Sequence, residues 1–158
     1  MIDLAAQARI VLHQAFFGGL AAAGFGVLFN FGPRSLALCA GAGAFALAVR
    51  TLGLDAHWTL EGATFVAALA TASVALIGLR GLGAAAQAIA LAGCIPMVPG
   101  AFLNEALLGF FTISASEAVN AEAAILPSLQ AMLRFIFTLG AIGAGLAIPS
   151  HLARRRGF

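Results

Sequence analysis

The heptapeptide CIPMVPG, residues 94–100, interrupts an otherwise apolar stretch with two prolines and a glycine. Pro96 and Pro99 lack an amide hydrogen and so free the carbonyls four residues before them, and Gly100 admits backbone angles that other residues avoid. The amides that open the next helical piece would carry partial positive charge, which suits an anionic ligand group. Broken helices of this kind form many transporter sites, although a proline kink that only serves packing has the same sequence.

Four polar residues lie where the chain is otherwise apolar. Glu105 has the chemistry to bind an ammonium group, carry a proton or pair with an arginine; in the alternative it only favours the dipole at a helix start. Arg50, near the end of its apolar stretch, either reaches out to the membrane interface or faces inward and binds a carboxylate. Arg134 lies deeper and either binds substrate or pairs with Glu105. Asn104 is a further candidate for substrate binding.

Two more polar residues belong to the first apolar stretch. His13 is either a proton-transfer residue or a polar interior or interfacial residue, and Asn30 either contacts substrate or satisfies the backbone at the following turn. The candidates for proton coupling are Glu105 and His13. The candidates for substrate binding are Asn30, Arg50, Pro96, Pro99, Gly100, Asn104, Glu105 and Arg134.

The sequence contains no recognisable catalytic or metal-binding pattern. Its spacing pairs no nucleophile with a base, no glycine-rich phosphate loop precedes a helix, and Cys39 and Cys94 lack the spacing of metal ligands. Both cysteines are interpreted as small buried hydrophobes. We therefore expect a protein that is not an enzyme and that needs no metal or cofactor.

The elements that must position these residues follow from the composition. Of the 158 residues, 62% are hydrophobic and only 9% are charged, and the mean hydropathy is +1.04. A soluble domain has about 25% charged residues, so lipid is the expected solvent, and continuous apolar runs predict helices rather than barrel strands. We predict an all-α integral membrane protein with a single transmembrane domain over residues 1–158. Its five spans are expected at about 10–31, 35–54, 59–79, 82–114 (broken at 96–100) and 125–149.

The arginines predict the orientation of these spans. With five crossings, Arg34, Arg80 and the arginines at 154–156 share one side that has no acids, whereas most acids fall on the other side. Because cytoplasmic loops are rich in basic residues, we predict that the N-terminus lies outside and the C-terminus in the cytoplasm. The fourth stretch must then cross the membrane despite its break, since a stretch that returned to the same side would place the terminal arginines outside.

The chain resembles the threonine/serine exporter family in FNFGPRSLALCAGAGAFALAVR at 29–50, in Trp58 and Phe65, in IPMVPG at 95–100 and in the terminal AIPSHLARRR. The match is to the C-terminal membrane half of that family, which also occurs as a separate small protein beside a larger subunit; one such bacterial pair is a succinate exporter. Asn104, Glu105 and Arg134 lie outside the family pattern. The positions that match it are Asn30, Arg34, Arg50, Pro96, Pro99 and Gly100.

This resemblance implies a subunit of a secondary exporter of small amino acids such as threonine and serine, or of dicarboxylates such as succinate, driven by an ion gradient, with protons the expected ion. It implies a second membrane subunit of opposite orientation in the bacterial inner membrane, and a higher oligomer is compatible with it. A homo-oligomeric channel and a non-transporting assembly subunit are the alternatives. Nucleic acid is not an expected partner, because the arginines are dispersed except at the C-terminus.

Overall fold

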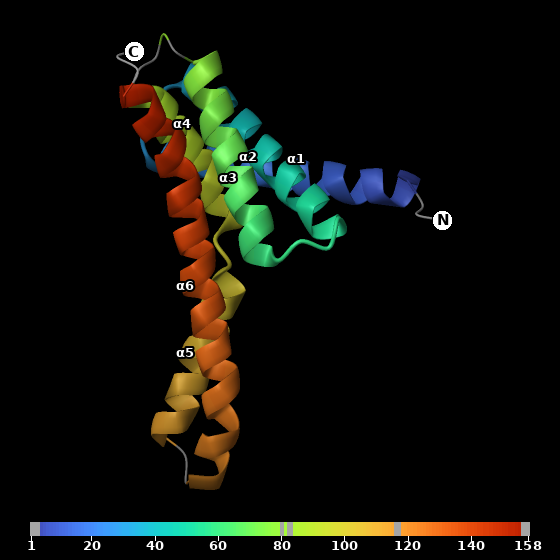
Figure 1. Cartoon of the computed structure of the whole chain (residues 1–158), viewed down its shortest axis with the longest axis vertical. Helices are drawn as coiled ribbons and strands as arrows, with labels where there is room; N and C mark the ends of the chain where they lie inside the picture. Colours follow the sequence, from blue (N-terminus) through green and yellow to red (C-terminus); the bar gives the residue numbers. More distant parts are fainter. Residues whose placement is uncertain (1–3, 80, 82–83, 116–117, 156–158) are drawn as a thin grey trace. The chain divides into compact units, whose positions relative to one another are not determined.

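The computed structural model describes residues 4–79, 81, 84–115 and 118–155, which are helical almost throughout and contain no strand (Figure 1). The helices are α1 (Leu4–Leu28), α2 (Pro33–Asp55), α3 (Leu60–Gly78), α4 (Ala84–Cys94), the short 3-10 helix η2 (Ile95–Met97), α5 (Gly100–Ala115) and α6 (Ala118–Arg155). Among them, four are long and apolar enough to cross a membrane, and a fifth crossing results if α4 and α5 form one broken span. The predicted all-helical membrane fold with a broken helix at residues 96–100 is confirmed.

The first turn is shaped by Asn30, whose φ of 58° lies in the left-handed region. The Asn30 amide bonds back to the Val27 carbonyl, and the next amide bonds to the Gly26 carbonyl. This pair of bonds is the Schellman motif that commonly ends helices. α1 therefore ends at Leu28, before the predicted limit of residue 31, and α2 starts at Pro33, whose ring fixes a φ suited to a first helical position.

The connection between α2 and α3 uses similar chemistry. His57 has a φ of 61°, and its amide bonds to the Leu54 carbonyl while the next amide bonds to that of Gly53. Thr59 then caps α3, because its hydroxyl accepts a hydrogen bond of 3.1 Å from the Gly62 amide. A side-chain cap of this kind stabilises a helix start by about 1 kcal/mol.

The chain divides into two compact units. The first contains α1, α2, α3, α4, η2 and the part of α6 that starts at Ala141. The second, Val98–Gly140, contains α5 and the earlier part of α6. As one continuous helix from Ala118 to Arg155, α6 extends past both ends of the span expected at 125–149 and runs through Pro149.

The core of the first unit is built from small side chains. Its buried residues are mostly Ala, Thr and Cys, whereas large apolar side chains such as Leu12 (70% exposed) and Leu28 (76% exposed) point outward. Lipid tails are as apolar as leucine, so membrane helices associate through small residues that let their backbones approach. An interior of small residues under a surface of large ones is therefore what a lipid-exposed bundle requires.

The backbones of α1 and α2 approach most closely at Gly43. A methyl group at Gly43 would lie 2.5 Å from the Gly18 carbonyl oxygen, and one at Gly93 of α4 would lie 2.6 Å from the Ala42 side chain. α2 thus lies against both α1 and α4, and only glycine permits either contact. The antiparallel α1–α2 pair also brings Gln7 to Asp55, whose carboxylate accepts a hydrogen bond of 3.2 Å.

Candidate functional site

The break between α4 and α5 is where the two prolines act. α4 ends at Cys94, η2 continues to Met97, and α5 starts at Gly100. Within the break the Gly100 amide bonds to the Val98 carbonyl at 2.9 Å, and the Phe102 amide bonds to that of Pro99 at 3.1 Å. Two of the amides that open α5 are thus used locally, which leaves fewer for an anionic ligand than the sequence suggested.

The 3-10 helix of the break lies inside the first unit. η2 packs against α1, α2 and α4. Met97 and Cys94 are fully buried, and Ile95 and Pro96 are half-buried. Irregular backbone at membrane depth is tolerated where protein surrounds it, so these neighbours provide what the interrupted helix needs.

Arg50 of α2 reaches this break with its guanidinium group. Its Nη1 donates a hydrogen bond of 2.9 Å to the Met97 carbonyl oxygen. A continuous helix would supply that carbonyl with the amide of residue 101, but the helix stops at Met97 and the arginine takes the place of the amide. The sequence had suggested free carbonyls at Ala92 and Ile95, whereas the carbonyl that a side chain engages is that of Met97.

The same guanidinium has one donor without a partner. The Arg50 Nε is buried and makes no hydrogen bond to any described residue, and a buried unsatisfied donor costs about 1–3 kcal/mol. Nε and Nη2 form one edge of a guanidinium, with two parallel N–H groups that match a carboxylate. Because the Met97 carbonyl occupies Nη1, that edge remains for a second acceptor.

Asn30 and His13 do not share a contact with Arg50. Asn30 is exposed at the α1–α2 turn, and Arg50 lies seventeen residues after Pro33, so roughly 25 Å along α2 separate the two. His13 is close to the level of Arg50 in the antiparallel pair, yet its side chain is exposed and its ring packs 4.7 Å from that of Phe17. Asn30 thus has a visible structural role at the helix end.

The remaining candidates belong to the second unit. Gly100 is exposed, a methyl group there would meet nothing within 4 Å, and its φ is not in the left-handed region. The expectation that this glycine serves unusual backbone angles is therefore wrong: it is an ordinary first residue of α5. Asn104 and Glu105 are exposed on α5, and the Arg134 guanidinium lies 5.5 Å from the centre of the Phe102 ring.

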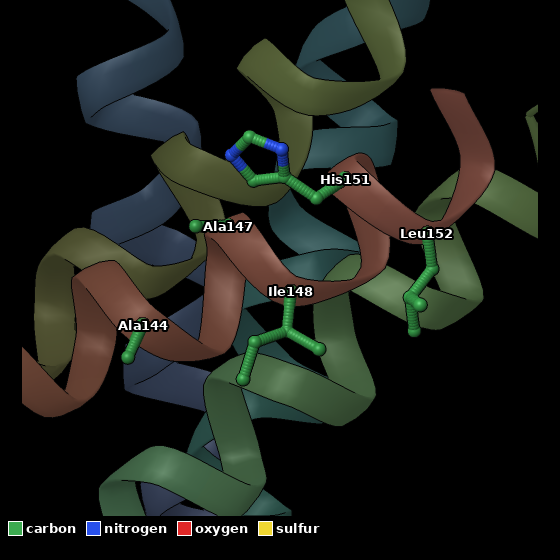
Figure 2. Close-up of a pocket in the computed structure, with 5 residues that line it drawn as sticks. All are labelled: Ala144, Ala147, Ile148, His151 and Leu152. Carbon is green, nitrogen blue, oxygen red and sulfur yellow. The ribbon is translucent and has the colours of Figure 1, made fainter. Parts of the chain in front are cut away.

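Two shallow hollows occur in the first unit, and neither is lined by a candidate residue. The first hollow, of about 330 Å³, is lined by α6 alone. Figure 2 shows His151 and Ala147 on one side of that helix, and Ile148 and Leu152 on another side. Because a single helix lines this hollow, a ligand there would be contacted on one side only. Within the described residues, no group of three or more His, Cys, Asp or Glu side chains gathers as metal ligands would.

The Met97 carbonyl is the partner of Arg50 that sequence reasoning missed. Its partner Arg50 was a candidate, and the break was recognised, but nothing in the sequence pairs α2 with η2. An arginine within an apolar stretch, together with an interrupted helix elsewhere, is the signal that would have suggested the pair.

Comparison with known proteins gives a consistent result. Residues 14–152 match the family described as Threonine/Serine exporter, ThrE. An uncharacterized protein of Haemophilus influenzae is 31% identical over 150 residues, which cover 92% of this chain and 48% of the relative. The chain therefore spans about half the length of that relative. No solved structure matches this chain.

The match starts at residue 14, within α1, and ends at residue 152, within α6, so it includes the break and Arg50. The apolar helices make the chain a multi-pass membrane protein. On this evidence the chain belongs to the threonine/serine exporter family.

Proposed function

We propose that this chain is the small subunit of a secondary exporter of small amino acids such as threonine and serine, or of dicarboxylates such as succinate. Its family membership supports an exporter. The chain corresponds to only 48% of the Haemophilus influenzae relative, so we propose that a second membrane subunit supplies the other half. The whole complex acts in the bacterial inner membrane, with this chain as one membrane domain.

The observation that carries the proposal is the Arg50 guanidinium at the break. Threonine, serine and succinate share a carboxylate, and arginine binds that group through two parallel hydrogen bonds. Arg50 offers an edge for this purpose, because Nη1 is bonded to the Met97 carbonyl and Nε has no partner. The substrate carboxylate binds at this edge.

Binding at Arg50 also affects the broken helix. The Nε atom is covered, so a carboxylate reaches it only when the surrounding side chains move. Any rotation of the guanidinium changes its bond to the Met97 carbonyl, and Met97 is the last residue of η2. Substrate binding and the conformation of the break are therefore coupled, as alternating access requires. An ion gradient, with protons as the proposed ion, drives the cycle.

The test is export from proteoliposomes loaded in turn with labelled threonine, serine and succinate. The vesicles contain this chain alone, the proposed second membrane subunit alone, or both. We expect export of at least one substrate only when both are present. If no small amino acid or dicarboxylate leaves the vesicles in any arrangement, the proposed function is wrong.

Arg50 variants locate the site. Arg50→Gln should lower transport efficiency by about tenfold or more, since one lost charge-assisted bond is worth roughly 1.5–3 kcal/mol. Arg50→Lys keeps the charge without the paired donors and should mainly raise KM. Arg9→Gln is the matched control, because Arg9 is an exposed arginine on α1. Equal transport by Arg50→Gln and Arg9→Gln, at equal amounts of folded protein, would remove Arg50 from the site.

A further inference from the structure

Helix α5 and the first part of α6 form an antiparallel pair in the second unit (Figure 1). Phe102 lies beside Arg134, and a methyl group at Gly109 would meet Ser128, so residue numbers rise along α5 as they fall along α6. These contacts show which side of each helix faces the other.

Glu105 and Arg134 lie on the same side of this pair. Glu105 follows Phe102 by three residues on α5, and Arg134 follows the buried Ala131 by three residues on α6. A step of three residues turns a helix back by about 60°. Two antiparallel helices run in opposite directions when viewed from one end. An equal rotation along each chain, starting from the side that faces the other helix, therefore leads to the same side of the pair. One acid and one base are therefore neighbours on one surface, which we call the Glu105/Arg134 face.

This face has no complete set of partners within the described residues. Both side chains are exposed, and no hydrogen bond or ion pair to either is found there. Arg134 has only the ring of Phe102, at 5.5 Å, and such a contact is worth about 0.5–2 kcal/mol.

The position of Arg134 in a long apolar helix disfavours exposure to lipid. It lies twelve residues after Glu122 and nineteen before Ala153 in an apolar helical stretch of 32 residues. At 1.5 Å per residue this stretch is roughly 48 Å long, whereas a hydrocarbon core is about 30 Å thick, so Arg134 lies within the core or at its edge. A charge within the core faces water or pairs with an opposite charge, and at the edge it reaches out to the interface.

We propose that the Glu105/Arg134 face binds the same face of a second copy of this chain. A two-fold axis along the helices places α5 of one copy opposite α6 of the other, so each Glu105 meets the other copy's Arg134. The face carries one charge of each sign side by side and is therefore complementary to itself, as a two-fold interface must be. This assigns Glu105 and Arg134 to assembly rather than to substrate, and it does not depend on the proposed substrate.

The first test is the mass of the purified wild-type chain, with and without the proposed second membrane subunit, by native mass spectrometry from lipid nanodiscs. We expect complexes that contain two copies of the 15.9 kDa chain. A monomer, or a complex with one copy of this chain beside the other subunit, overturns the proposal.

Charge reversal then tests the face itself. Glu105→Arg alone places arginines against arginines at the two-fold interface, and Arg134→Glu alone places acids against acids, so each should lower the dimer fraction by about tenfold or more. Asn104→Arg is the matched control, because Asn104 is turned away from α6 by roughly a further 100°. It should leave the dimer fraction unchanged.

Co-expression of the two reversed chains with different tags separates assembly from folding. Within each reversed chain both charges have the same sign, but between the two chains both pairs are opposite. Mixed dimers should therefore outnumber either homodimer by about tenfold. Failure of the mixed dimer to form, while a double variant Glu105→Arg/Arg134→Glu behaves as wild type, would show that the charges act within one chain and would overturn the proposal.

Discussion

Replacing Gly43 by alanine should destabilise the α1–α2 pair, whereas the same replacement at Gly41, on the same helix, should not. A methyl group at Gly43 would lie 2.5 Å from the carbonyl oxygen and 3.2 Å from the carbonyl carbon of Gly18. Both atoms belong to the backbone, so no side chain can rotate to make room. At Gly41 a methyl group would meet nothing within 4 Å.

The magnitude follows from two opposing effects. Overpacking of a closely packed interface destabilises by about 1–3 kcal/mol, and the higher helix propensity of alanine returns about 1 kcal/mol at either position. We expect Gly43→Ala to lose stability, Gly41→Ala to gain about 1 kcal/mol, and the two to differ by the overpacking effect of about 1–3 kcal/mol. At 2–4 °C per kcal/mol, the difference in Tm is roughly 2–12 °C.

The assay is the thermal stability of the purified chain in one detergent, measured as the monodisperse fraction left after heating. Gly18→Ala tests the same contact from α1, because a methyl group there would lie 2.7 Å from Leu47 Cγ, 2.9 Å from Leu47 Cβ and 3.0 Å from the Gly43 carbonyl oxygen, so it should also destabilise the pair. Equal Tm values for Gly43→Ala and Gly41→Ala would refute the inferred backbone contact between α1 and α2.

Three further predictions address other parts of the chain. His57→Gly should raise Tm by about 2–8 °C in the same assay, because a non-glycine residue in the left-handed region costs about 1–2 kcal/mol; a lower Tm would contradict the inferred strain. Gly109→Ala should weaken α5–α6 packing through its clash with Ser128, whereas Gly140→Ala, which meets nothing within 4 Å, should be tolerated; equal loss in the two would argue against that contact. Reporter fusions should place the N-terminus outside and the C-terminus in the cytoplasm, and the reverse result would overturn the charge argument.

Much of the candidate site was visible in the sequence, but its key contact was not. The prolines that break the helix and the charge of Arg50 stand out in an apolar chain. The acceptor of that charge is the Met97 carbonyl, which any residue at that position would provide. Backbone acceptors leave no mark in a sequence, so the pair appears only when α2 and η2 are placed together.

The sequence by itself determined that this chain belongs in lipid, that it is helical and that one helix is interrupted. A chain with 62% hydrophobic and 9% charged residues suits lipid, its continuous apolar runs fit helices rather than barrel strands, and Pro96 and Pro99 break one of them. The family pattern around Arg50 and the break was also readable.

Only the tertiary structure showed which sides of the helices meet. A helix that is apolar all round carries no periodic signal for its buried side, so Gly41 and Gly43 are indistinguishable in sequence. In the structure Gly43 touches the backbone of α1, while Gly41 remains free. The packing of small residues, rather than hydrophobic periodicity, selects these contacts, because lipid gives no preference between one apolar side and another.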